Sequence, residues 1–349
     1  MPWIARPGAV VESYLSGQAG GAAVADLLFG RANPCGKLAE TFPLKPSDVL
    51  SDQWFPGSNR QVQYREGLFV GYRYFDAADA SVLFPFGHGL SYTQFDYEAL
   101  ALSHKSFEQG SELLVSLKLT NTGSVPGAEV VQLYVGSRKP TLHSPPQALR
   151  AFAKVMLQPG ETRDVTLRLD DTAFALFDIG RGTWVVEPGE VEIRVGASSR
   201  DIRLTQTLST YSSQHPSKPP NDSAPIGFDD QLIGSDPVFS AGLGKPIPPP
   251  ESSRPFHSNS SLNEIAETWL GNKIRSRVVT QFKDQMGVAG ADETINKMFE
   301  EVAGNMPLRA MVLFSGGKLS FKSLNVLLAV LNGNVFRAMR LLVTPASRS

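Results

Sequence analysis

Residues 113–119 read Leu-Leu-Val-Ser-Leu-Lys-Leu, so that every second position is aliphatic. Successive side chains of a β-strand point to opposite faces, and a period of two therefore predicts a strand with one buried face. The same alternation recurs in residues 131–135, 165–169 and 191–195. Turn signals such as Asn121-Thr122-Gly123 and Pro188-Gly189 separate these segments. About seven strands over residues 94–208 predict an immunoglobulin-like β-sandwich without the Cys-Trp-Cys pattern of antibody domains.

Two segments precede the predicted sandwich. Residues 1–43 contain a strand-like stretch at 9–15 and a helix-like stretch at 22–29 that ends at Gly30. Because parallel α/β layers need several strands covered by helices, this single unit predicts the truncated remnant of an α/β sandwich domain. Residues 44–93 are rich in Pro, Gly and aromatic residues. We interpret them as an aromatic connector that packs across another surface.

Two further segments follow the predicted sandwich. Residues 209–260 are rich in Pro, Ser and Asn, which predicts a stiff, extended linker. In residues 261–345 the apolar residues recur with a period of about 3.6, and Ser261-Leu262-Asn263-Glu264 is a capping box. This region predicts a small all-α cluster of about five or six short helices. The chain is therefore expected to be multidomain.

The composition excludes several classes of protein. The 33 Lys and Arg residues nearly balance the 34 Asp and Glu residues, so no overall charge would attract nucleic acid or an anionic membrane. The longest aliphatic run, residues 326–331, is far shorter than the roughly 20 residues of a membrane-crossing helix. The N-terminus has no signal-peptide pattern, and the lone Cys35 permits no internal disulfide. We therefore expect a cytoplasmic protein with no nucleic-acid or membrane partner.

Motifs for cofactor binding and catalysis are missing. Residues 30–37 suggest a phosphate-binding loop, but its glycines have the wrong spacing and Leu38 stands where Ser or Thr is required. The histidines are scattered without a second ligand at metal spacing, and no Gly-x-Ser-x-Gly motif occurs. We predict no metal site and no cofactor. Glu66 and Asp76 are the only acids that we place near a site, and we assign neither a catalytic role.

Several motifs follow one another in a distinctive order. They are the Gly-Gly helix of residues 17–30, Asn33-Pro34-Cys35-Gly36-Lys37-Leu38, the aromatic segment 64–76, Phe84-Pro85-Phe86-Gly87-His88-Gly89 and Val130-Val131-Gln132-Leu133-Tyr134-Val135. In this order the chain resembles the C-terminal portion of a glycoside hydrolase family 3 enzyme of the β-glucosidase type, with a fibronectin type III-like domain. The tail, with residues 305–309 and 313–317, resembles a helical extension of some bacterial members.

The resemblance implies that the nucleophilic aspartate and the acid/base glutamate of this family belong to segments upstream of this sequence. We therefore predict no catalytic or substrate-binding residue, and no hydrolysis by this chain alone. A β-glucoside becomes a substrate only when the missing catalytic domains are supplied, and a partner chain could cover residues 1–93. Six connector residues are predicted to form the interface to the missing domains: Tyr64, Arg65, Glu66, Tyr72, Arg73 and Tyr74.

An alternative function is a non-catalytic module that binds carbohydrate or protein through the sandwich. Sugar-binding faces usually present flat aromatic rings. The predicted sandwich has six candidate aromatic residues: Phe107, Tyr134, Phe152, Phe174, Phe177 and Trp184. Most of them lie in strand or turn contexts that suit a core, so we favour the hydrolase fragment.

Overall fold

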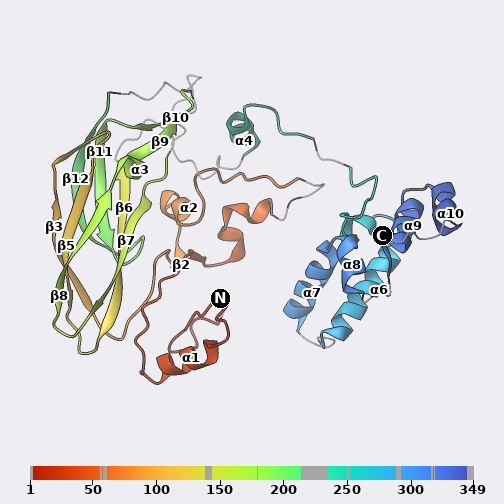
Figure 1. The fold of residues 1–349 in the computed structure, drawn as a ribbon, viewed down its shortest axis with the longest axis horizontal. Helices are drawn as coiled ribbons and strands as arrows, with labels where there is room; N and C mark the ends of the chain where they lie inside the picture. Colours follow the sequence, from red (N-terminus) through yellow and green to blue (C-terminus); the bar gives the residue numbers. More distant parts are fainter. Residues whose placement is uncertain are drawn as a thin grey trace. The chain divides into compact units, whose positions relative to one another are not determined.

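The computed structural model describes residues 3–55, 57, 61–137, 144–178, 180–213, 235–249, 252–287, 292–315, 317 and 319–343. The chain divides into two compact units (Figure 1). The first unit combines Met1–Phe55 with Gln63–Ile247, and the second combines Pro56–Val62 with Pro248–Ser349.

Two β-sheets pack face to face in the first unit (Figure 1). One has the strand order β4-β12-β11-β6-β7 and the other the order β3-β5-β8. The strands are β3 (Phe95–Leu102), β4 (Ser106–Glu108), β5 (Leu113–Asn121), β6 (Gly127–Ser137), β7 (Ala148–Leu157), β8 (Thr162–Leu169), β11 (Gly189–Gly196) and β12 (Ile202–Tyr211). Leu113, Val115, Leu117 and Leu119 of β5 are all buried, and the residues between them are more exposed. The predicted sandwich is confirmed.

Strand β6 departs from the prediction of one buried face. Gln132 and Tyr134 alternate with the core residues of this strand, yet both are buried. The connector covers this outer face of the larger sheet, since Tyr72 packs edge-on against Tyr134 and the Gly87 carbonyl accepts a hydrogen bond from Gln132. Both faces of β6 are therefore protected from solvent.

The sandwich aromatics divide evenly between core and surface. The buried ones are Phe107, Tyr134 and Phe174, and the exposed ones are Phe152, Phe177 and Trp184. Phe177 and Trp184 face each other across a hairpin of β9 (Ala175–Asp178) and β10 (Thr183–Val186), which follows the short helix α3 (Asp171–Phe174). The expectation that most of the six suit a core is thus wrong for three. Phe177 and Trp184 lie on a two-stranded hairpin, and Phe152 lies on the edge strand β7, on the outer face that it shares with its register partner Gln132.

The N-terminal segment forms a helix but no strand. Helix α1 (Gly20–Leu28) ends before Gly30, whose φ of 69° suits the predicted helix stop. Residues 9–15, predicted as a strand, belong to no strand and are exposed. A strand requires a hydrogen-bonded neighbour, and none of the strands in the described ranges pairs with this segment.

The connector consists of short elements. Strands β1 (Phe42–Pro43) and β2 (Val82–Phe84) pair with each other, and between them lie the 3-10 helices η1 (Pro46–Asp48) and η2 (Leu50–Gln53) and the helix α2 (Tyr72–Ala77). A small separate core surrounds Leu50 and Phe69, with Trp54, Tyr74 and Ala77 packed against it. The connector therefore has a small core of its own.

The predicted extended linker contains helix α4 (Asp236–Leu243). Pro237 lies in its first turn, where the missing N–H of proline costs no hydrogen bond, and Gly244 ends it in a left-handed conformation. Residues 214–234, 250 and 251, which include half of the ten prolines between Pro216 and Pro255, lie outside the described residues. The prediction of an extended chain is thus wrong for residues 236–243. That prediction relied on the number of prolines, whereas Pro237 and Gly244 favour the start and the end of a helix.

The second unit is a cluster of helices, as predicted. In its described part the helices are α5 (Leu262–Ile265), α6 (Trp269–Gln285), α7 (Glu293–Asn305), α8 (Leu308–Phe314), α9 (Phe321–Leu331) and α10 (Val335–Val343). The Ser261 side chain accepts a hydrogen bond from the Glu264 N–H, and the Glu264 side chain accepts one from the Ser261 N–H, which confirms the capping box. Leu262, Ile265, Leu308 and Leu324 belong to the buried core of this cluster.

Candidate functional site

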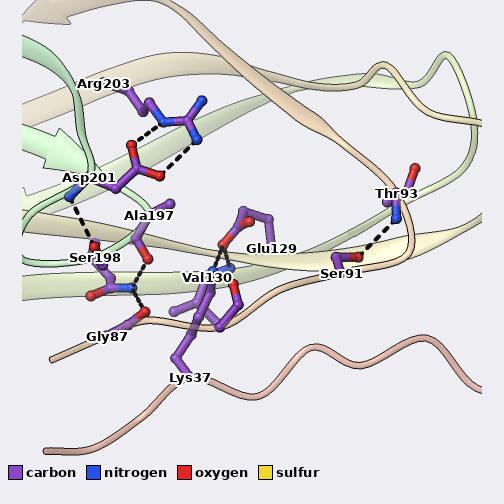
Figure 2. Close-up of polar contacts among 12 residues, drawn as sticks. Lys37, Gly87, Ser91, Thr93, Glu129, Val130, Ala197, Ser198, Asp201 and Arg203 are labelled. Carbon is purple, nitrogen blue, oxygen red and sulfur yellow. Dashed lines mark hydrogen bonds and ion pairs between the residues drawn. The ribbon is translucent and has the colours of Figure 1, made fainter. Parts of the chain in front are cut away.

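The contacts between residues 33–93 and the outer face of the larger sheet form the most elaborate polar cluster of the first unit, and we call them the seam. Its centre is Gln132, whose Nε2 donates to the carbonyl oxygens of Gly87 at 3.1 Å and Ala197 at 2.7 Å (Figure 2). The Tyr134 hydroxyl donates to Gln132 Oε1 at 2.6 Å. Burial raises the pKa of Tyr134, so the phenol stays protonated and keeps this bond.

Gly87 is required where the connector meets Gln132. Its φ is 79°, and a Cβ atom built there would lie 2.0 Å from Gln132 Oε1. Any other residue would therefore have both an unfavourable backbone conformation and a steric clash with the buried amide. The glycine at position 87 thus permits a close approach of the connector backbone to the Gln132 side chain.

A buried ion pair lies beside this contact. Lys37 Nζ is 2.9 Å from Glu129 Oε1, and both side chains are almost completely buried. The ammonium also donates to the Gly89 carbonyl, and the carboxylate accepts from the Val130 N–H (Figure 2). These extra hydrogen bonds compensate for the loss of water around two buried charges.

Asn33 fastens the N-terminal segment to a turn of the sandwich. Its Nδ2 donates to the Pro126 carbonyl at 3.0 Å, and its Oδ1 accepts from the Ser91 hydroxyl and the Tyr92 N–H. The Tyr92 hydroxyl in turn donates to the Leu27 carbonyl at 2.9 Å, at the end of α1. The conformation of residues 27–33 is thus fixed by polar contacts.

Asp76 connects α2 to the sheet. Its carboxylate accepts from Arg200 Nε at 3.0 Å and from Gln147 Nε2 at 2.9 Å. Gln147 continues the network, since its Nε2 also donates to the Ser199 carbonyl and its Oε1 accepts from Arg194 Nη1. With both oxygens engaged, Asp76 has a structural role in this chain.

The six predicted interface residues have different surroundings. Tyr64 is exposed over 82% of its surface. The Arg65 guanidinium lies over the rings of Trp54 and Phe239 and is 2.6 Å from Asp236 Oδ1 of α4. Glu66 is partly buried, which raises the pKa of its carboxyl group.

The other three predicted residues lie on α2. The Tyr72 ring stacks on Phe86 with centroids 4.6 Å apart, and its hydroxyl accepts from the Leu149 N–H. Arg73 lies over the Tyr72 ring, and Tyr74 packs edge-on against Phe75. Burial, together with the charge of Arg73, lowers the pKa of Arg150. The three side chains of α2 thus contact other residues of the first unit. Of the six predicted residues, Tyr64 is the one whose side chain is largely exposed.

A large part of the apolar surface of residues 1–93 faces solvent. Helix α1 has no buried residue, and Phe29, directly after it, is 75% exposed. Exposed large apolar residues of this region also include Val10, Val11, Leu15, Leu28, Leu68, Val70 and Leu90. These side chains are not covered by other parts of the described chain.

Titratable groups in the described ranges form no recognisable catalytic centre. No group of three His, Cys, Asp or Glu residues there could hold a metal ion, and no described helix is long and apolar enough to cross a membrane. The His88 ring stacks on Phe84, and burial, followed by the charge of Lys37, lowers the His88 pKa. His88 is thus a packing residue of the seam.

The seam is hard to detect in the sequence. The alternation of residues 131–135 places Gln132 on the face away from the core, and nothing in its neighbours shows that another segment covers it. One usable signal is the cluster of Gly and aromatic residues at 84–92, since glycines in such a segment permit close backbone approach.

Comparisons with known proteins agree with the motifs. Residues 1–92 match the model of the glycosyl hydrolase family 3 C-terminal domain, and residues 129–199 match the fibronectin type III-like domain. The chain is 38% identical over 332 residues to thermostable β-glucosidase B of Acetivibrio thermocellus, which covers 95% of this chain and 39% of that protein. This match extends into the helical tail, since so few residues are left unmatched.

Other relatives match a shorter part. An exo-α-(1→6)-L-arabinopyranosidase of Bifidobacterium breve is 42% identical over 207 residues, 59% of this chain and 27% of that protein. The crystal structure of a family 3 β-glucosidase of Bifidobacterium adolescentis superposes with a TM-score of 0.57 at 35% identity, over 78% of this chain and 35% of that chain. The chain thus spans between 27% and 39% of the length of these relatives.

Proposed function

Since this chain corresponds to the C-terminal part of a glycoside hydrolase family 3 β-glucosidase, we propose that it is the non-catalytic scaffold of such an enzyme and hydrolyses no glycoside by itself. It completes an active glycosidase when the catalytic domains are joined to it, in the same chain or as a partner chain that covers residues 1–93.

The contrast between the two sides of residues 1–93 is the observation that carries this proposal. Their inner side is anchored to the sandwich by the seam, with the buried Lys37–Glu129 pair and the Gln132 amide. Their outer side presents α1, Phe29 and Tyr64 to solvent. A segment held rigidly on one side and apolar on the other is suited to dock further domains.

The absence of hydrolysis follows from the chemistry. Retaining glycosidases need two carboxyl groups about 5 Å apart in one cleft, one as nucleophile and one as acid/base. Of the two acids that we placed near a site, Asp76 is held by Arg200 and Gln147, and Glu66 has a carboxyl group whose pKa is raised by burial. A carboxyl group with a raised pKa can act as a general acid, but retaining hydrolysis also needs a nucleophilic carboxylate beside it.

An activity assay on the purified chain tests this first part. With an aryl β-glucoside we expect no turnover above a heat-inactivated control. Turnover that Glu66→Gln or Asp76→Asn abolishes would show that the chain has its own active site and would overturn the proposal.

Complementation tests the docking role. The N-terminal part of the Acetivibrio thermocellus β-glucosidase, ended before the segment that matches this chain, is co-expressed with it, and aryl β-glucoside hydrolysis is measured. We expect activity from the pair, and loss of activity with Leu28→Asp and Phe29→Asp together. Phe152→Asp, on an equally exposed aromatic of the sandwich, is the matched control and should leave the activity unchanged. Equal loss in both variants would contradict docking through residues 1–93.

A second candidate function rests on the Phe177–Trp184 pair. Their rings are 5.5 Å apart on the exposed side of the β9–β10 hairpin, and Trp184 is 63% exposed. Such rings could bind carbohydrate chains through the sandwich alone. A pull-down on insoluble glucans tests this function: we expect wild-type protein in the bound fraction and Trp184→Ala in the unbound fraction, and recovery of wild type unbound would exclude it.

A further inference from the structure

A polar cavity of about 420 Å³, open to solvent over most of its extent, lies at one end of the seam. Its lining includes Asp76, Asp79, Arg194, Arg200, Ser199 and Thr205. Small-molecule sites in proteins usually have volumes of about 300–1,000 Å³, so this cavity is within their range. The docking role proposed above does not use it.

The charges along this cavity nearly cancel. Arg200 is paired with Asp76 at 3.0 Å, and Arg194 is hydrogen-bonded to Glu192 at 2.9 Å. Both guanidinium groups are thus already neutralised by carboxylates of this chain. An anion would gain little from them, and it would be repelled by Asp79 at the exposed rim.

Hydroxyl groups also contribute to the lining. Thr205 is exposed on β12, and Ser199 is buried, with a hydroxyl that has no hydrogen-bond partner among the described residues. A buried polar group without a partner costs free energy, and such groups are found where something else satisfies them. Ser199 is among the residues that line the cavity, so a ligand there would supply a partner for this hydroxyl.

We propose that this cavity binds a small neutral polyol of monosaccharide size. A ligand hydroxyl both donates and accepts, so one ring of hydroxyls can donate to the Asp79 carboxylate, accept from the arginine N–H groups and exchange hydrogen bonds with Thr205 and Ser199. Ile202, which also lines the cavity, offers an apolar surface for the C–H groups of the ring. The inference does not rest on the proposed function, since it concerns a site within this chain alone.

Saturation-transfer NMR with the full chain tests the proposal, with D-glucose as the probe. We expect saturable binding in the millimolar range, because the site offers hydrogen bonds but no aromatic platform. Thr205→Val, which removes one hydrogen bond, and Asp79→Asn, which replaces a charged acceptor by a neutral one, should each weaken it about fivefold. Asparagine tolerates the positive φ of 48° at position 79, so Asp79→Asn keeps the backbone conformation.

Thr207→Val is the matched control, two residues further along the exposed face of β12 and outside the cavity lining. It should leave glucose binding unchanged. Absence of saturable binding, or equal binding by wild type, Thr205→Val and Asp79→Asn, would overturn the proposal. Binding of inorganic phosphate or glycine that these variants weaken, with glucose inactive, would assign the cavity to a charged ligand and would also overturn it.

Discussion

The two sides of residues 1–93 differ in the interactions that they offer. The side against the sandwich is polar, and its buried groups are paired, as Lys37 is with Glu129 and Gln132 with Gly87 and Ala197. The opposite side has apolar residues in water, among them Leu28 and Phe29. Polar pairing therefore positions this segment against the sandwich with a specific geometry, whereas the apolar side chains of its other side remain in water.

The largest effect is expected from breaking the buried ion pair. Glu129→Ala leaves the Lys37 ammonium buried without a counter-charge, which should lower the free energy of unfolding by about 3–5 kcal/mol. Urea denaturation measures this loss. Glu161→Ala, at an ion pair with Arg163 on the surface, is the control and should lower the free energy of unfolding far less, because solvent screens exposed ion pairs. Similar losses in both variants would mean that the seam contributes little to the stability of this unit.

The next effect concerns the close approach at Gly87. Gly87→Ala brings a Cβ atom to 2.0 Å from Gln132 Oε1 and keeps a φ of 79° that disfavours alanine. Gly160→Ala is a matched control, because its φ is 75° but nothing lies within 4 Å of the new Cβ. We expect about 1 kcal/mol of destabilisation for Gly160→Ala and about 1–3 kcal/mol more for Gly87→Ala, measured by urea denaturation. Equal destabilisation by the two variants would show that the Gln132 side chain moves away from the new Cβ atom at little cost in free energy.

On the opposite side, polar substitution should leave the stability unchanged. Leu28→Ser and Phe29→Ser together replace side chains that are already in water, so the free energy of unfolding should change by less than about 0.5 kcal/mol. The same double variant should bind less of a dye that fluoresces on apolar surfaces. A loss of stability as large as that of Gly87→Ala would show that these residues are already packed in the isolated chain.

The smallest effect is a pH dependence from His88. Burial, and then the charge of Lys37, lowers its pKa below 6.5 in the folded state. Between that lowered pKa and about 6.5 the unfolded chain binds more protons, so stability decreases as the pH falls through this window. His88→Gln should remove this part of the slope in urea titrations at several pH values, whereas His104→Gln, at an exposed position, is the control. An unchanged slope in His88→Gln would exclude His88 as the source.

Local sequence patterns determined the individual elements and the classes of domain. The alternation of residues 113–119 and the capping box at Ser261 depend on neighbours a few residues away, so the sequence alone predicted the sandwich and the helical cluster. The motifs also identified the family, because their order along the chain is distinctive.

Which faces of the strands are covered by other segments depends on tertiary contacts and could be seen only in the structure. Gln132 meets Gly87, and Glu129 meets Lys37, across 45 and 92 positions of sequence respectively. Burial of a strand face depends on what packs against it, and that partner leaves no periodic signal in the strand itself. For the same reason the structure, and not the alternation, showed β6 to be buried on both sides and residues 9–15 to lack the neighbour that a strand requires.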